Sequence, residues 1–259
     1  MNKVPALMST VILGTRIHAV TWDLAITCII YWANEQQSKM VCFCNVHGLV
    51  SAGSDPLLYG ALSKADLALP DGAPLAWIMR RRLWPDQQRL NGPDLMWLLL
   101  AEASKQSIPV YFFGSTPTTL SKLIQNIQTT YPSLHIAGYS SPPFLRGALD
   151  CARAASDAAR INQSGAKIVF VGLGCPKQEK WMANQTQQIH AVMLGVGAAF
   201  DYHAGTLARA PLTWQHTGLE WLYRITQEPL RLLPRYLITN TIFLFKLIAE
   251  MRKKPHQKK

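Results

Sequence analysis

The stretch Ile168-Val-Phe-Val-Gly-Leu-Gly-Cys-Pro-Lys-Gln-Glu-Lys-Trp181 decides the fold of this chain. Its first four residues are apolar, which is typical of a short strand that is buried on both faces of a sheet. Gly172 and Gly174 permit a sharp turn, and Pro176 fits the first turn of a helix, where its missing N–H removes no hydrogen bond. We therefore predict a strand, a glycine turn and a helix in succession. The residues at the start of that helix are Lys177, Gln178 and Glu179.

This strand–turn–helix unit is a candidate site for an anion or a nucleotide. The unpaired N–H groups at a helix N-terminus favour anions, and open α/β sheets bind ligands at the carboxyl ends of their strands. An ordinary strand-to-helix turn contains the same kinds of residue. The stretch alone leaves both interpretations open.

Strands and helices alternate along the rest of the chain. An opening hairpin is expected at residues 11–20, and strands are expected at residues 39–44, 65–72, 110–114, 135–139 and 191–195. Helices are expected at residues 23–35, 73–82, 94–104, 115–130 and 148–164, and a further helix is expected to begin at residue 55. This alternation predicts an α/β fold with a Rossmann-like, mainly parallel sheet flanked by helices. We expect an α/β core at residues 1–204 and a basic helical appendage at 205–259.

Composition narrows the class of protein. Of the 259 residues, 49% are hydrophobic and 16% are charged, which predicts a sizeable core and excludes general disorder. The five cysteines are odd in number and irregularly placed, so we expect buried thiols in a reducing compartment. No apolar run reaches the ~18–20 residues that span a bilayer, and residues 4–13 lack a convincing cleavage site for a signal peptide.

The net charge of +11 is concentrated near the C-terminus. Residues 224–259 contain nine Lys and Arg but only two acids, a net charge of +7. Such a segment favours polyanions, either nucleic acid or an anionic membrane surface. The tail at 230–251 mixes Leu, Ile and Phe with basic residues, and Asn240 and Lys246 leave it too short an apolar run to span a bilayer. It is expected either to lie on a membrane or to pack on the core.

Four polar residues follow predicted strands or their glycine turns, and they are Asn45, Asp71, Gln178 and Asp201. Because the carboxyl ends of parallel strands meet at one edge of a sheet, we expect these side chains to converge. Each of them is also an ordinary capping or turn residue type. Asp71, held between Pro70 and Gly72, has the placement that a general base for an alcohol needs.

The sequence contains no obvious metal or dinucleotide motif. No Asp-x-Asp pair and no cluster at metal-ligand spacing occurs, and Cys42-x-Cys44 has no second ligand pair. Gly172-x-Gly174 and Gly195-x-Gly197 both lack the third glycine of the dinucleotide fingerprint. We expect neither a metal nor a cofactor. If a nucleotide diphosphate leaves during a reaction, its charge must be met by arginines and helix N-termini.

Arginines are available for that task. Arg89 precedes the turn at residues 92–94, and Arg224, Arg231 and Arg235 are spaced to share one helix face. Pro229 and Pro234 are expected to break that helix. A solvated basic face is the alternative interpretation.

Together these motifs resemble the WecG/TagA/CpsF family, the bacterial glycosyltransferases of teichoic-acid linkage-unit, enterobacterial-common-antigen and exopolysaccharide synthesis. The resemblance covers nearly the whole chain. Its carriers are Asn45-Val-His47, Ala65-Asp66, Pro70-Asp71-Gly72, Arg89-x-x-Gly92-x-Asp94-Leu95, Gly172 through Trp181, Gly195-Val-Gly197, Phe200-Asp201, Ala204-Gly205, Arg209-Ala-Pro211, Gly218 through Arg224, and Glu228-Pro229 through Arg235-Tyr236.

The resemblance implies metal-independent, inverting transfer of a sugar, N-acetylmannosamine or a related hexose or uronic acid, from a UDP donor to a polyprenyl-diphosphate-linked acceptor. It implies peripheral attachment to the cytoplasmic face of the plasma membrane, an appendage that closes the site, and Asp71 as the base. The residues expected to hold the substrates are Asn45, Arg89, Gly92, Asp94, Gly174, Gln178, Glu179, Asp201, Arg224, Arg231 and Arg235.

One position departs from the family pattern. Phe43 stands where the family usually has Thr, so a hydroxyl contact is absent or supplied elsewhere, which leaves the sugar open. Two other functions stay open from the residues alone: a basic nucleic-acid-binding protein, which the lack of interleaved aromatics in the tail disfavours, and a nucleotide-dependent oxidoreductase. Self-association into a homo-oligomer is also open.

Overall fold

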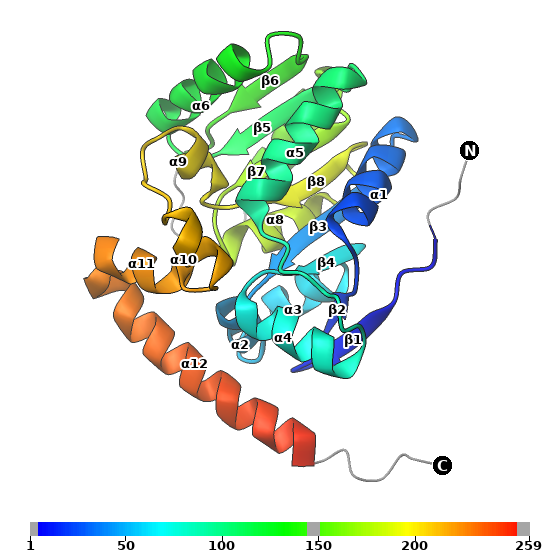
Figure 1. Ribbon diagram of the computed structural model, residues 1–259. Helices are drawn as coiled ribbons and strands as arrows, with labels where there is room; N and C mark the ends of the chain where they lie inside the picture. The colour runs from blue at the N-terminus through cyan, green and yellow to red at the C-terminus, as the bar shows by residue number, and fades with distance from the viewer. Residues whose placement is uncertain (1–4, 144–150, 253–259) are drawn as a thin grey trace.

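A computed structural model describes residues 5–143 and 151–252. Its centre is a six-stranded sheet with the order β4-β3-β8-β7-β5-β6, in which all neighbouring strands are parallel (Figure 1). The strands are β3 (Lys39–Cys44), β4 (Leu67–Pro70), β5 (Val110–Gly114), β6 (Ile136–Ser140), β7 (Ile168–Gly172) and β8 (Val192–Gly195). The predicted α/β fold with a parallel sheet flanked by helices is confirmed.

Each face of the sheet carries its own apolar core. Along β7, Ile168 and Phe170 point into one core and Val169 and Val171 into the other, because successive side chains in a strand alternate between faces. The first face is covered by α1 (Trp22–Asn34), α5 (Gly92–Lys105), α6 (Pro117–Thr130) and α9 (Ala199–His203). The second is covered by α2 (Val46–Ala52), α3 (Pro56–Ser63), α4 (Ala73–Arg82), α7 (Cys151–Gln163) and α8 (Lys177–Gln185).

The N-terminal elements agree with expectation apart from one cap. β1 (Ser9–Ile12) and β2 (Thr15–His18) form the predicted antiparallel hairpin. Helix α1 was expected to begin at Asp23, but Thr21 is its N-cap and accepts a hydrogen bond at Oγ1 from Leu24 N at 3.1 Å. A Thr hydroxyl two residues earlier satisfies the same unpaired N–H groups. Asp55 does cap α3 as predicted, accepting from Leu58 N at 3.1 Å.

The chain ends in three helices beside the sheet, α10 (Leu212–His216), α11 (Glu220–Gln227) and α12 (Pro229–Arg252). The expectation that prolines break this region is correct at Pro229, which begins α12, and wrong at Pro234, which lies inside it. Pro234 is exposed, and so is Leu230, the residue whose carbonyl would accept from position 234 in an uninterrupted helix. The buried residues Leu232 and Thr239 hold the helix on both sides of the proline.

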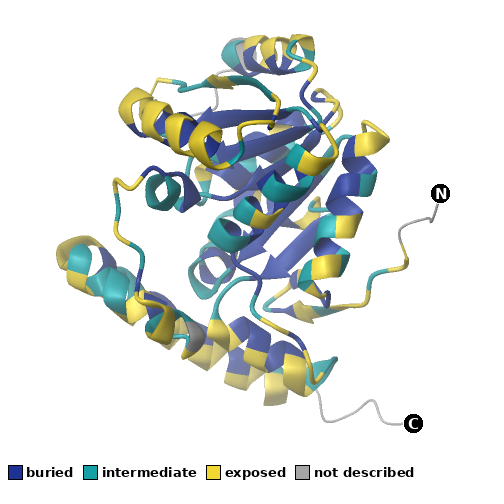
Figure 2. Cartoon of the chain, turned by 45° about the horizontal axis from the view of Figure 1, so that its top comes forward, coloured by how far each residue is buried: buried dark blue, intermediate teal, exposed yellow. Residues whose placement is uncertain are grey.

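The length of α12 differs from the expectation that the tail is too short to span a bilayer. The helix has 24 residues, and the mean hydropathy of its most apolar window is 1.3. By length and composition alone it could cross a membrane, although 22% of that window is buried inside the protein. Phe243 and Leu247 pack into the second core, while the opposite side of the helix is exposed (Figure 2). One face of the tail helix thus packs on the core, and the other face is exposed.

Candidate active site

A cavity of about 1790 Å³ lies at the carboxyl ends of the central strands. Its walls come from the loops after β3, β4, β5, β7 and β8, and residues of α11 and the first half of α12 close one side of it. The predicted site residues that line it are Asn45, Asp71, Arg89, Gly92, Gly174, Gln178, Glu179, Asp201, Arg224, Arg231 and Arg235. Asp94 is the one predicted residue that does not line it. Residues separated by up to 190 positions thus meet in one place.

Asp71 directly follows β4, and its backbone N–H donates to Cys44 O at 2.8 Å, which extends the β3–β4 ladder by one bond. Gly72 then turns the chain with φ +108°, a conformation that favours glycine. The Asp71 side chain is 24% exposed, so it remains open to the cavity. Burial raises the pKa of Asp71 above its ordinary value, and this is opposed by the nearby Arg89.

Arg89 is held between two carboxylates. Its Nε lies 3.4 Å from Asp71 Oδ1, and its Nη2 lies 2.6 Å from Glu220 Oε2 on α11. Burial alone would lower the pKa of Arg89, but the nearby carboxylates of Asp71 and Glu220 outweigh this effect and raise the pKa above its ordinary value. This guanidinium therefore stays charged. Glu220 is 6% exposed and also accepts from Arg209 Nε at 3.4 Å. An ion-pair chain therefore connects the sheet edge with the C-terminal helices.

Asp94 lies farther along the same chain of ion pairs, behind the cavity. Its carboxylate binds the Arg209 guanidinium through both oxygens, with a distance of 3.0 Å for Oδ2, and it also accepts from Asn91 Nδ2 at 2.7 Å. Although burial opposes the effect, the hydrogen bonds from Arg209 and Asn91 lower the pKa of Asp94. Asp94 thus anchors residues 205–211 to α5, and its carboxylate is already occupied by protein groups.

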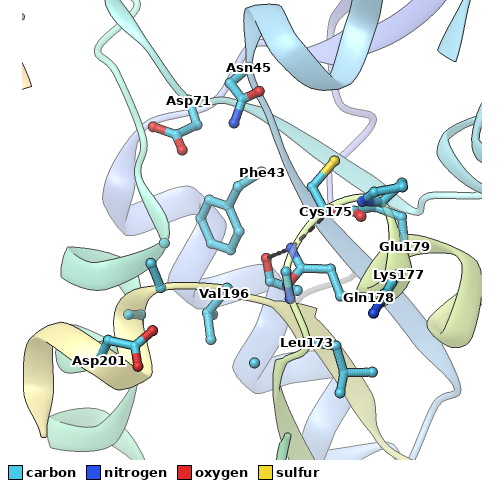
Figure 3. A pocket seen from close by; sticks show the side chains of 18 of the residues that line it. Phe43, Asn45, Asp71, Leu173, Cys175, Lys177, Gln178, Glu179, Val196 and Asp201 are labelled. Carbon is cyan, nitrogen blue, oxygen red and sulfur yellow. Dashed lines mark hydrogen bonds between the residues drawn. The ribbon is translucent and has the colours of Figure 1, made fainter. Parts of the chain in front are cut away.

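Asn45 and Asp71 occupy adjacent strand ends, because Cys44 and Pro70 are paired in register. Asn45 caps α2 by accepting at Oδ1 from Gly48 N at 3.0 Å, which leaves its amide N–H₂ for the cavity. In Figure 3 these two side chains lie on one side of the cavity, with the Phe43 ring between them and Gln178. Phe43 is only 8% exposed and belongs to the first core, so an aromatic ring forms the cavity wall at this point.

Gln178 is held in one orientation at the start of α8. Its Nε2 donates to Gly195 O at 2.7 Å and to Glu179 Oε1 at 2.9 Å, while its Oε1 accepts from Gly174 N at 3.2 Å. Both amide protons are therefore used inside the protein, and the amide oxygen retains acceptor capacity beside the cavity. The helix that carries it is fixed by Trp181, which stacks on Phe113 with ring centroids 4.2 Å apart.

Glu179 is a buried carboxyl group, 3% exposed, at the cavity wall. Its Oε2 has no hydrogen-bond partner among the described residues, and Lys180, the cation next to it in sequence, binds Asp55 at 2.5 Å instead. Burial raises the pKa of Glu179, since its hydrogen bonds with Gln178 and Cys175 compensate only in part. The neutral acid of Glu179 is therefore stabilised relative to that of an exposed glutamate.

Two glycines of the site are required for different reasons. Gly174 has φ +77°, and a Cβ there would meet open space, so its conformation rather than crowding favours glycine. Gly92 has an ordinary φ, but a Cβ on it would lie 3.1 Å from Val196 O. Glycine at this position lets the start of α5 approach the β8 loop.

The three C-terminal arginines are not equivalent. Arg224 is on α11 and Arg231 and Arg235 are on α12, so the predicted single helix face is replaced by two helices that meet at the cavity. The Nε atoms of Arg224 and Arg235 are buried without a hydrogen-bond partner among the described residues. Arg231 is mostly exposed and forms an ion pair with Glu228.

Asp201 and Tyr202 line the cavity beside Arg224. The Arg224 guanidinium is 5.9 Å from the centre of the Tyr202 ring. Burial raises the pKa of Asp201, and Arg224 opposes this. Burial also raises the pKa of Tyr202 to about 12, so its hydroxyl stays protonated and, without a partner among the described residues, remains able to donate.

Sequence reasoning missed Glu220, which lines the cavity, and Arg209, which binds Glu220 and Asp94 without lining it. Both lie in motifs of the family resemblance, but their partners Asp94 and Arg89 are 115 and 131 positions away, so only the fold reveals the ion pairs. Among the residues that the structure describes, no group of three or more His, Cys, Asp or Glu side chains is arranged to hold a metal ion.

A parallel α/β sheet with a polar cavity beyond its carboxyl ends is the arrangement of many enzymes that bind nucleotides. The chain matches the model of the Glycosyl transferase WecG/TagA/CpsF family over residues 10–257. It belongs to this family and is therefore a glycosyltransferase of bacterial cell-surface polysaccharide synthesis, with a sugar donor and an acceptor as substrates. This assignment favours glycosyl transfer over the nucleic-acid-binding and oxidoreductase alternatives.

Proposed function

We propose that this glycosyltransferase moves a sugar from a UDP donor to a polyprenyl-diphosphate-linked acceptor, with inversion at the anomeric carbon and without a metal. The observation that carries the proposal is the position of Asp71, a carboxylate of raised pKa that faces a cavity also lined by Arg224 and Arg235, whose Nε atoms are unpaired among the described residues. A base and a cationic leaving-group site in one cavity suit a direct displacement.

In the proposed reaction Asp71 accepts the proton of the acceptor hydroxyl as that oxygen bonds to the anomeric carbon. The bond between this carbon and the diphosphate oxygen breaks, and UDP leaves with the electron pair. A single displacement inverts the anomeric centre. The donor sugar is proposed to be N-acetylmannosamine or a related hexose or uronic acid, and Asn45 and Gln178 supply a donor and an acceptor for its polar groups.

The leaving diphosphate is proposed to lie near Arg224 and Arg235. Their buried Nε atoms are unpaired among the described residues, and a charge-assisted hydrogen bond to a phosphate oxygen would satisfy each of them. The α8 N-terminus at Lys177 faces the same cavity and adds favourable N–H groups. These cationic and N–H groups are the basis for proposing that no metal is required.

The acceptor is proposed to arrive from the inner face of the plasma membrane. Arg235 and Asn240 of α12 line the cavity. Many other residues of this helix are exposed (Figure 2), and they include large apolar side chains. These side chains are Leu230, Leu233, Leu237, Ile238, Leu244, Phe245, Ile248 and Met251. An amphipathic basic helix of this kind is suited to an anionic bilayer surface, so α12 would place the cavity next to a lipid-borne diphosphate.

The decisive experiment measures UDP release from a panel of UDP-sugars with a polyprenyl-diphosphate-linked acceptor and EDTA. We expect release that requires the acceptor and is lost in Asp71→Asn. Release abolished by EDTA and restored by Mg²⁺ would contradict the metal-independent mechanism. If no donor supports release, titration with UDP alone separates an acceptor missing from the panel, which leaves UDP binding intact, from a cavity that does not bind nucleotide.

A further inference from the structure

Glu220 is a charged residue of the C-terminal helices that is buried against the core. It begins α11, its side chain is 9% exposed, and its carboxylate faces Arg89 and Arg209. The contact with Arg89 Nη2, at 2.6 Å, is shorter than the 3.4 Å contact between Arg89 Nε and Asp71. Arg89 is thus shared between the base and a residue of α11, and its shorter contact is with α11.

This sharing matters because every charge close to Asp71 changes its strength as a base. Two cations face it, Arg89 from the loop before α5 and Arg224 from α11, and both lower its pKa. Glu220 has the opposite effect and raises the pKa of Asp71, adding to the larger effect of burial. From β3, the Cys44 thiol is a further titratable neighbour, and burial raises its pKa so far that it stays neutral.

We propose that Glu220 is a positioning residue for the catalytic base: by holding Arg89 on α11, it prevents Arg89 from neutralising Asp71, so that docking of α11 completes the base. This inference rests on the proposed function, in which Asp71 accepts the acceptor proton. A site whose C-terminal helices are displaced has a base paired fully with Arg89, and its proton transfer is slow. Productive chemistry is thereby coupled to closure of the cavity.

The charge of Glu220 can be removed while the segment before α11 stays anchored to the core. Arg209 remains bound to Asp94 through both carboxylate oxygens, so the segment before α11 keeps its anchor when Glu220 is changed. Glu220→Gln preserves the shape and one acceptor oxygen, and Glu220→Asp preserves the charge on a shorter side chain. Glu102→Gln is the matched control, because Glu102 binds Lys105 within α5 and does not line the cavity.

The first measurement is a ¹³C NMR titration of the Asp71 carboxyl in the full-length protein, which does not depend on activity. We expect Glu220→Gln to lower the Asp71 pKa by about one unit, since it removes a nearby like charge, and Glu102→Gln to leave it unchanged. An unchanged or raised Asp71 pKa in Glu220→Gln would overturn the proposal. So would loss of hydrogen-exchange protection across residues 220–227, which would assign Glu220 a purely structural role.

The second measurement is the pH dependence of kcat/KM for glycosyl transfer. We expect the acid limb of Glu220→Gln to move to lower pH, because the base deprotonates earlier. We also expect the plateau to fall by roughly 3–10-fold, because a weaker base accepts the proton less readily, with Glu220→Asp recovering part of the loss. An acid limb that stays in place contradicts the inference, whereas a wild-type protein that transfers no sugar refutes the proposed function and leaves the NMR result standing.

Discussion

Arg82 at the end of α4 and Glu250 near the end of α12 form an ion pair of 2.8 Å that fixes the C-terminal helix to the core. The other oxygen of Glu250 accepts from Leu13 N at 3.0 Å, so the hairpin joins the same contact. With its far end held in this way, α12 lies along the protein and presents its apolar side outward (Figure 1). This geometry suits a helix that lies on a membrane surface rather than one that crosses it.

Phe245→Asp tests that membrane contact. Phe245 is 70% exposed on α12, so the change removes apolar area without disturbing the core. We expect binding to phosphatidylglycerol vesicles to fall about tenfold or more, since burying such a side chain contributes about 1.5–3 kcal/mol. Co-sedimentation measures it, with Tyr139→Asp on β6, 55% exposed, as the control. Equal losses in both variants, or none in Phe245→Asp, would argue against α12 as the membrane-binding surface.

Asp71→Asn tests the base. The amide keeps the size of the side chain but accepts no proton, so we expect kcat to fall by roughly 10²–10⁴. UDP affinity, measured by calorimetry, is expected to stay within about threefold of wild type, because Asp71 is not among the groups proposed to hold the diphosphate. Turnover near the wild-type rate would exclude Asp71 as the base.

Arg224→Gln tests the diphosphate site. The buried Nε of Arg224 has no partner among the described residues, so it is free to bind a phosphate oxygen. Loss of a hydrogen bond to a charged group costs about 1.5–3 kcal/mol, which corresponds to a roughly 10–100-fold weaker affinity for UDP. Arg81→Gln serves as the control, because Arg81 stacks on the exposed Trp77 ring outside the cavity. Equal UDP affinity in the two variants would place the diphosphate elsewhere.

The core strands could be predicted because each is a short, uniformly apolar run. Val110–Gly114 and Ile168–Gly172 occur at the expected positions, since both strands are buried on both faces of the sheet. Predictions from local sequence were wrong where another residue could cap the same helix, or where a proline lay on the exposed side of a helix. Thr21 replaced Asp23 as a cap, and the exposed Pro234 was accommodated inside a helix.

The candidate site was predictable to the extent that it is built from strand ends. Asn45, Asp71 and Gln178 follow parallel strands, so the topology alone brings them to one edge of the sheet. The contacts of Arg89 with Glu220 and of Asp94 with Arg209 depend on how the C-terminal helices dock. No local pattern carries that information, because the partners are more than 100 positions apart.

Glu179→Gln tests the protonation state of the buried carboxyl beside Gln178. The pKa of Glu179 is raised in the folded protein by burial, whereas in the unfolded chain it is about 4.3. The folded state therefore binds the proton more tightly, so the stabilising contribution is complete below the unfolded pKa and is lost as pH rises toward the folded pKa. The glutamine variant has no such proton to lose, and its amide still bonds to Gln178.

We therefore expect the free energy of unfolding of Glu179→Gln, relative to wild type, to increase as pH rises above about 4.3, by at most ~1.4 kcal/mol per pH unit. Urea unfolding at several pH values measures it. Glu102→Gln is the control, because hydrogen bonds from Gln106 and Lys105 lower the pKa of the near-surface Glu102 and reverse the sign of any trend. A stability difference independent of pH would mean that folding does not raise the pKa of Glu179, and would contradict the prediction.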